Sequence, residues 1–113
     1  MKIDFPEIIS KDFTDKNLKM NLLVSKSVKY FDGHFEGFAL LPGVVQLHWA
    51  LKYAKEHFLI DSDFNLFQNI KFAHPIYPGQ KLLLEMSLSS GYLLYSYSDK
   101  RKTFSSGKIK INA

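Results

Sequence analysis

The sequence contains no cysteine and no long apolar run. The missing cysteine excludes a disulfide framework, a thiol nucleophile and thiolate metal sites, and it is typical of a reducing compartment. The longest apolar run, 38–45, contains Pro42 and is far shorter than the roughly 20 residues that span a bilayer. Near the N-terminus, Asp4 and Glu7 interrupt what would be the apolar part of a signal peptide. We therefore expect a soluble, cytoplasmic protein.

Basic charge is present but is not concentrated. The formal net charge is +4, yet the lysines are scattered and no nucleic-acid-binding motif occurs, so we expect no nucleic-acid partner. The only basic run, Lys100, Arg101 and Lys102, is typical of a hairpin turn. A mildly positive surface also suits an acidic protein partner.

Length and composition indicate one globular domain over residues 1–113. Hydrophobic residues make up 46% and charged residues 23%, which separates the chain from disordered proteins. Aromatic residues are frequent at 15%, and they suit a compact core, an acyl pocket or a subunit interface.

The apolar pattern predicts strands on both sides of one helix. In the segment 18–28, Met20, Leu22, Val24 and Val28 share one face of a strand. Four more strands are predicted over 66–73, 80–89, 92–98 and 103–112, each bounded by turn-forming residues. A helix followed by such a meander indicates the α+β class, with an antiparallel sheet wrapped around one long central helix.

The helix is predicted over 44–58, directly after Pro42 and Gly43. Proline is favoured at a helix start because its missing N–H would have no partner there. Val44, Leu47 and Leu51 recur at helical spacing, and the same stripe continues through Ala54 and Phe58.

The most informative segment is 33–48, where a glycine-bracketed loop leads into this helix. His34 lies in the loop and His48 lies in the helix. The first amides of a helix are unpaired, so the Gly43 N–H can hold a carbonyl oxygen that gains negative charge. A neutral imidazole nearby can accept a proton at physiological pH. His34 is therefore a candidate base, with a structural role in the loop as the alternative.

Two blocks of the sequence resemble the signatures of the 3-hydroxyacyl-acyl-carrier-protein dehydratases of the FabZ/FabA type. Six residues of the first block match in identity and spacing: Gly33, His34, Phe35, Pro42, Gly43 and Val44. The second block, at 72–79, is similar to the Phe-x-x-Pro-x-x-Pro-Gly signature that follows the helix in this family. The resemblance covers most of the chain, and it looks closest to the dehydratases of aryl-polyene pathways.

This resemblance implies a hot-dog fold and a dimer that needs no cofactor. It implies the loss of water from a 3-hydroxyacyl group on an acyl carrier protein, giving a trans-2-enoyl thioester in fatty-acid or aryl-polyene-type biosynthesis. His34 takes the place of the family's catalytic histidine. The substrate-binding positions fall on Phe35, Pro42, Gly43 and Val44.

The chain departs from the family at several positions, of which position 48 matters most. Glu36 and Ala39 replace loop prolines, and Lys52 replaces a glutamine. His48 stands where the family has its catalytic Asp or Glu. An imidazolium there could protonate the leaving hydroxyl, although burial and the nearby helix N-terminus are expected to disfavour the cation. Alternatively, His48 orients a water, binds the hydroxyl, or is a core histidine satisfied by a backbone carbonyl.

Two other functions stay open on the sequence alone. The chain could be a non-catalytic hot-dog subunit that supports an active partner in a heterodimer, or an acyl-thioester hydrolase. A zinc site built from His34, His48 and His74 lacks a close-spaced pair, so no metal is expected. His57 and His74 are predicted as surface or partner-satisfied residues.

The carrier proteins of such systems are acidic. Four lysines are therefore predicted to form a basic rim at the mouth of the pocket: Lys52, Lys55, Lys71 and Lys81.

Overall fold

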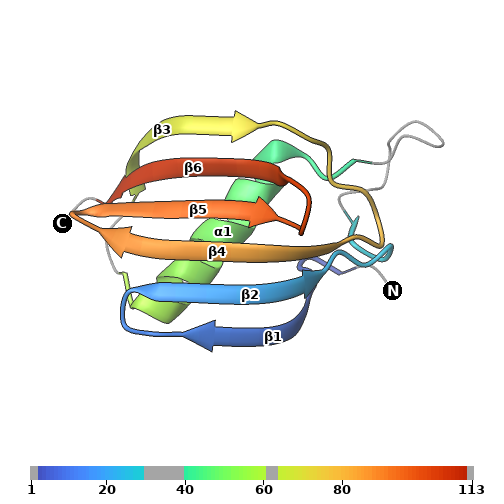
Figure 1. Cartoon of the computed structure of the whole chain (residues 1–113), viewed down its shortest axis with the longest axis horizontal. Helices are drawn as coiled ribbons and strands as arrows, with labels where there is room; N and C mark the ends of the chain where they lie inside the picture. Colours follow the sequence, from blue (N-terminus) through green and yellow to red (C-terminus); the bar gives the residue numbers. More distant parts are fainter. Residues whose placement is uncertain (1–2, 30–39, 61–63, 112–113) are drawn as a thin grey trace.

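Six strands and one helix make up the fold of the residues that the structure, a computed structural model, describes: 3–29, 40–60 and 64–111. The elements are β1 (Glu7–Phe13), β2 (Asn17–Leu23), α1 (Gly43–Phe58), β3 (Phe64–Phe72), β4 (Lys81–Ser89), β5 (Tyr92–Ser98) and β6 (Thr103–Ile111). The strands form one sheet in the order β1-β2-β4-β5-β6-β3, and each pairing is antiparallel. The sheet curves around α1 (Figure 1). The predicted α+β class and its central helix are confirmed.

The predicted helix and the last four predicted strands agree with the structure to within two residues at the ends that it describes. The strand predicted over 18–28 ends early, because β2 stops at Leu23. The chain then turns, with the Val28 N–H donating to the Ser25 carbonyl at 3.1 Å. Val24 and Val28 are still buried as predicted, since the turn returns Val28 to the core.

Strand β1 was not predicted from the sequence. It forms one edge of the sheet, and every one of its residues is exposed. A bulge between Ile8 and Ser10 shifts its register. An exposed edge strand has no buried face, so it shows no alternation of apolar and polar residues.

The ends of α1 follow from its flanking residues. Pro42 is extended (φ −60°, ψ 145°), and its carbonyl accepts the Val45 and Gln46 amides at 3.1 and 3.2 Å. The helix ends at Leu59, which adopts the left-handed conformation (φ 54°) and donates its N–H to the Lys55 carbonyl.

The buried face of α1 differs from the predicted stripe. The residues that face the sheet are Val45, Gln46, Trp49, Ala50, Tyr53 and Ala54. Val44 is 73% exposed, and Leu47 and Leu51 are only partly buried. The helix is apolar on two faces, so spacing alone did not identify the core face. Ala50 and Ala54 are fully buried, and their small side chains allow α1 to approach the sheet closely.

The basic run forms the β5–β6 turn, as predicted. The Asp99 carboxylate accepts the Arg101 and Lys102 amides at 2.8 and 2.9 Å. These hydrogen bonds, that from Arg101 most of all, lower the pKa of Asp99. The turn leaves Lys100, Arg101 and Lys102 exposed.

Gly107 in β6 provides a test of the packing between the strands. A Cβ at this position would lie 2.6 Å from Cε1 of Tyr95 and would also overlap the Ile70 side chain. Gly107→Ala should therefore lower the free energy of unfolding by about 1–3 kcal/mol, because overpacking outweighs the smaller entropic gain of removing a glycine. Urea denaturation measures the change. Ser106→Ala, on the outer face of the same strand, should stay within about 0.5 kcal/mol of the parent. Equal effects of the two substitutions would contradict this account.

Candidate active site at the start of helix α1

The two predicted sequence blocks meet at the start of α1. The Leu41 N–H donates to the carbonyl of Ile76, in the second block, at 2.9 Å. The Leu41 carbonyl in turn accepts the side-chain amide of Gln46 at 3.1 Å. Gln46 is buried in the first part of the helix. The turn that precedes α1 is therefore held from both sides.

Phe72 at the end of β3 explains why position 43 is glycine. An ideal Cβ on Gly43 would lie 2.7 Å from Cζ of Phe72, so any side chain would displace the ring. Gly43 is the first residue of α1, and its N–H has no partner within the helix. The close packing of Phe72 fixes the position of this amide.

Tyr97 ties the beginning of α1 to the sheet. Its hydroxyl donates to the Gln46 carbonyl at 2.7 Å, and its ring is fully buried. Burial raises the pKa of Tyr97 well above 10.0, and the neighbouring Tyr95 and Tyr53 act in the same direction. Burial also raises the pKa values of Tyr53 and Tyr95 to about 12.

His48 lies on the exposed face of α1, so it does not fit the alternative of a core histidine. Among the described residues, it forms no hydrogen bond to a backbone carbonyl, and its ring lies 5.8 Å from the Phe5 ring at 31°. Phe5, Leu51, Lys52 and Lys55 line a hollow of about 390 Å³ with it. The expected burial of the His48 side chain is not seen in this chain, where the side chain is exposed.

Three large apolar side chains on α1 and β3 are exposed in this chain. Val44 precedes His48 by about one turn and is 73% exposed. Phe72 and Phe67, on the edge strand β3, are about half exposed. We call Val44, Phe67 and Phe72 the α1–β3 surface. An exposed apolar surface of this kind is typical of a protein–protein interface.

The structure describes only part of the predicted site. Gly33, His34 and Phe35 lie outside the described residues. Pro42, Gly43 and Val44 do lie together at the start of α1. Within the described ranges, no three potential metal-ligating side chains gather in one place.

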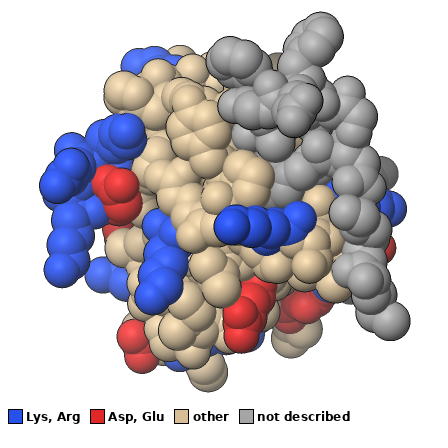
Figure 2. Space-filling model, turned by 90° about the vertical axis from the view of Figure 1, so that its right-hand side faces the viewer, with Lys and Arg blue, Asp and Glu red and all other residues tan. Residues whose placement is uncertain are grey.

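The four lysines predicted as a rim do not come together in this chain. Lys52 and Lys55 lie in the hollow beside His48. Lys71 and Lys81 lie in two separate hollows, of about 550 and 600 Å³. Figure 2 views the molecule from the end that holds the β5–β6 turn, and basic side chains gather there mainly on one side.

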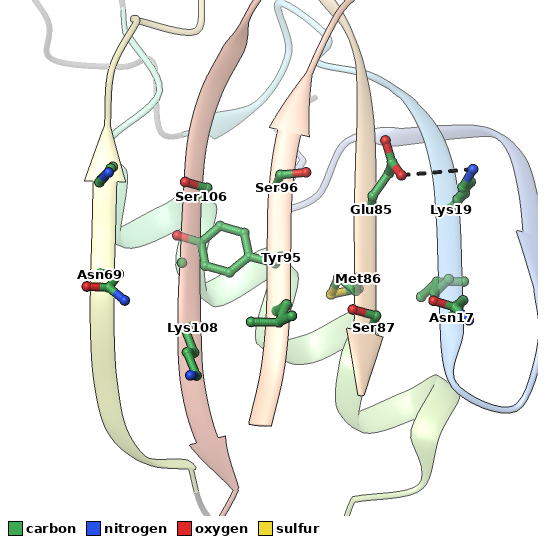
Figure 3. A pocket seen from close by; sticks show the side chains of 14 residues that line it. Asn17, Lys19, Asn69, Glu85, Met86, Ser87, Tyr95, Ser96, Ser106 and Lys108 are labelled. Carbon is green, nitrogen blue, oxygen red and sulfur yellow. Dashed lines mark ion pairs between the residues drawn. The ribbon is translucent and has the colours of Figure 1, made fainter. Parts of the chain in front are cut away.

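The hollow that contains Lys71 lies on the outer face of the sheet, the face turned away from α1 (Figure 3). Its polar lining includes Asn17, Ser96 and an ion pair between Lys19 and Glu85 at 3.9 Å. None of the described residues that line it is a histidine.

Phe5 is the residue of the site that sequence analysis missed. It lies 43 positions from His48 along the chain and belongs to neither block. No spacing rule connects the two residues, because the contact depends on how the N-terminal segment crosses α1.

Comparison with known proteins identifies the class of the fold and site. The model of the ApeI-like family, described as ApeI dehydratase, matches residues 10–108. The dehydratase heterocomplex ApeI:P from Xenorhabdus doucetiae is similar at 30% identity and a TM-score of 0.87, covering 94% of this chain and 96% of that chain. An uncharacterized protein from Erwinia carotovora subsp. atroseptica is similar at 36% identity and a TM-score of 0.80, covering 94% of both chains. No curated protein matches the sequence.

The fold is thus that of the hot-dog dehydratases, as the resemblance implied. The chain belongs to the ApeI-like dehydratase family. The resemblance to the aryl-polyene branch is confirmed. Within the described residues, α1 is too short and too polar to cross a membrane.

The buried tyrosines predict how stability changes in alkali. A folded-state pKa above the unfolded value of 10.0 means that the folded state keeps a proton that the unfolded state loses. The free energy of unfolding should be unaffected by these groups below pH 10, and it should fall as the pH rises toward about 12. Urea denaturation at a series of alkaline pH values measures the slope. Tyr97→Phe should make the slope shallower, and an unchanged slope would contradict the assignment.

Proposed function

We propose that this chain dehydrates 3-hydroxyacyl thioesters carried on an acyl carrier protein to trans-2-enoyl thioesters, in aryl-polyene-type or fatty-acid biosynthesis. The main support is the joining of the two dehydratase blocks at the start of α1, where Leu41 and Ile76 are hydrogen-bonded and Phe72 packs on Gly43. Membership of the ApeI-like family supports the same reaction class.

The proposed mechanism uses two histidines and one amide. Neutral His34 takes the α-proton, and the Gly43 N–H holds the thioester oxygen as it gains negative charge. The C–O bond at the β-carbon then breaks, and His48 as an imidazolium gives its proton to the leaving hydroxyl, which departs as water. The exposure of His48 in this chain supports this role, since substrate and solvent can reach the imidazole. Proton exchange with solvent restores both histidines.

We further propose that the active form is a dimer. The α1–β3 surface would be covered in such a dimer, and β3 offers an unpaired strand edge beside it. Contact across this surface would bring a second subunit close to the hollow that contains His48.

The second candidate function is that of a non-catalytic subunit in a heterodimer. Two observations favour it: His48 replaces the family's catalytic acid, and the similar structure from Xenorhabdus doucetiae is a heterocomplex. In this case the chain would complete the fold and interface of an active partner subunit.

Substitutions of the two histidines test the mechanism. His34→Ala and His48→Ala should each lower turnover by roughly two to four orders of magnitude, the usual contribution of a general acid or base. His48→Glu should restore part of the rate by recreating the family's acid. Mass spectrometry of a 3-hydroxyacyl carrier-protein substrate measures the loss of water and also detects any free acid that a hydrolase would release.

The results of these substitutions distinguish the catalytic role from the non-catalytic role of this chain. His57→Ala is the matched control, because His57 lies in the last turn of α1 and does not line the hollow that contains His48. If the purified chain is inactive alone but becomes active with a related subunit, and His48→Ala does not alter that activity, the non-catalytic role is correct.

The position of the lysines predicts which of them contact the carrier protein. Lys52→Ala combined with Lys55→Ala should raise KM and weaken its dependence on salt, because these lysines share the hollow with His48. Lys71→Ala combined with Lys81→Ala removes the same charge elsewhere and should change KM less. Steady-state kinetics at low and high ionic strength measures both effects. A larger effect of the second pair would contradict docking at the His48 hollow.

A further inference from the structure

The N-terminal segment 3–6 lies across α1 and contacts the site. Trp49, the residue after His48, donates its indole N–H to the Asp4 carbonyl at 2.9 Å. The Asp4 carboxylate forms an ion pair with Lys29 at 3.0 Å. Ile3 pairs with the chain near Val28, donating to the Ser27 carbonyl at 2.9 Å and accepting the Lys29 amide at 2.8 Å.

These anchors leave Phe5 little freedom. Asp4 is held on one side of it, and Pro6 is buried on the other. The Phe5 ring packs on the exposed face of α1, with His48 at 5.8 Å and Tyr53 at 6.2 Å between ring centroids. The Lys52 ammonium lies 4.6 Å from the centroid of the same ring.

The position of Phe5 matters for His48, for which no hydrogen bond is found within the described ranges. Among the described residues, Phe5 is the ring that packs against the His48 imidazole. Lys52 follows His48 by one helical turn, and its ammonium lies over the Phe5 ring while it pairs with the Glu56 carboxylate. An exposed histidine without such a neighbour would sample several rotamers.

We propose that Phe5 is a positioning residue for His48. Its ring packs beside the imidazole and favours the orientation from which the His48 side chain meets the substrate. This inference rests on the proposed role of His48 in proton transfer. It assigns a function to the N-terminal segment, which lies outside both dehydratase blocks and outside the matched residues 10–108.

The experiment compares Phe5→Leu with Phe5→Tyr in the assembly that shows dehydratase activity. Phe5→Leu keeps an apolar side chain but removes the ring, and it should lower kcat by roughly 10- to 100-fold with little change in KM, because a misplaced catalytic group costs about this much. Phe5→Tyr keeps the ring and should retain the parent kcat. The rate of His48 acylation by diethyl pyrocarbonate, followed by peptide mass spectrometry, should rise in Phe5→Leu alone.

Phe13→Leu is the matched control. The Phe13 ring packs on another histidine of the same helix, His57, at 4.8 Å, but at the opposite end of α1. This variant should leave kcat and His48 acylation unchanged, and urea denaturation should show that all three variants are folded.

Three results would overturn the proposal. In the first, Phe5→Leu has the parent kcat, whether or not acylation becomes faster. In the second, Phe5→Tyr loses as much activity as Phe5→Leu, so that the ring is not the cause. In the third, His48→Ala itself is fully active, which refutes the proposed role of His48 and not merely its positioning by Phe5.

Discussion

The structure depends on the packing of one face of α1 against the sheet, which leaves the opposite face of the helix exposed. Trp49, Ala50, Tyr53 and Ala54 fill the concave side of the sheet, and the Tyr97 hydroxyl anchors the first part of the helix through the Gln46 carbonyl. Because one face of α1 is packed in the core, only the opposite face of the helix is open to solvent. His48 lies on that free face, and Gly43 lies at its beginning. The hydrogen bond from Tyr97 ties the part of the helix between these two groups to the sheet.

Much of the fold could be predicted because its patterns are local. Alternation in β4 places Leu82, Leu84 and Met86 inward, and the Pro42–Gly43 pair marks the helix start to within one residue. The core face of α1 could not be predicted in the same way. Its two apolar stripes are similar in spacing, and only the curvature of the sheet selects the stripe with two alanines. That choice is a tertiary effect, and helical periodicity does not contain it.

The part of the candidate site that lies within the two short sequence blocks could be predicted from the sequence. The sequence predicted roles for the Gly43 amide and position 48, and the structure adds the contacts around them, from Phe72, Ile76 and Phe5. These three residues come from distant segments. Phe72 and Ile76 belong to the second block, which resembles the family signature. That resemblance indicated the block but not its contacts with the start of α1. Phe5 had no signal, since a single aromatic residue near a chain end is compatible with many environments.

A carboxylic acid and a histidine at position 48 would need different surroundings in order to donate a proton. A carboxyl group can donate a proton near neutral pH only if its surroundings keep it neutral, which requires burial or a nearby negative charge. An imidazolium has the opposite requirement, since it must keep a positive charge and is favoured by water or by the face of an aromatic ring. In this chain the position is exposed, and the neighbouring ring belongs to Phe5. The exposed setting of position 48 therefore agrees with the proposed use of a histidine there. A partner subunit that covers the α1–β3 surface would have to keep this solvation in order to preserve the same chemistry. In the proposed dimer, the partner's contacts near His48 would have to be polar or leave space for water. Its contacts against Val44, Phe67 and Phe72 would have to be apolar.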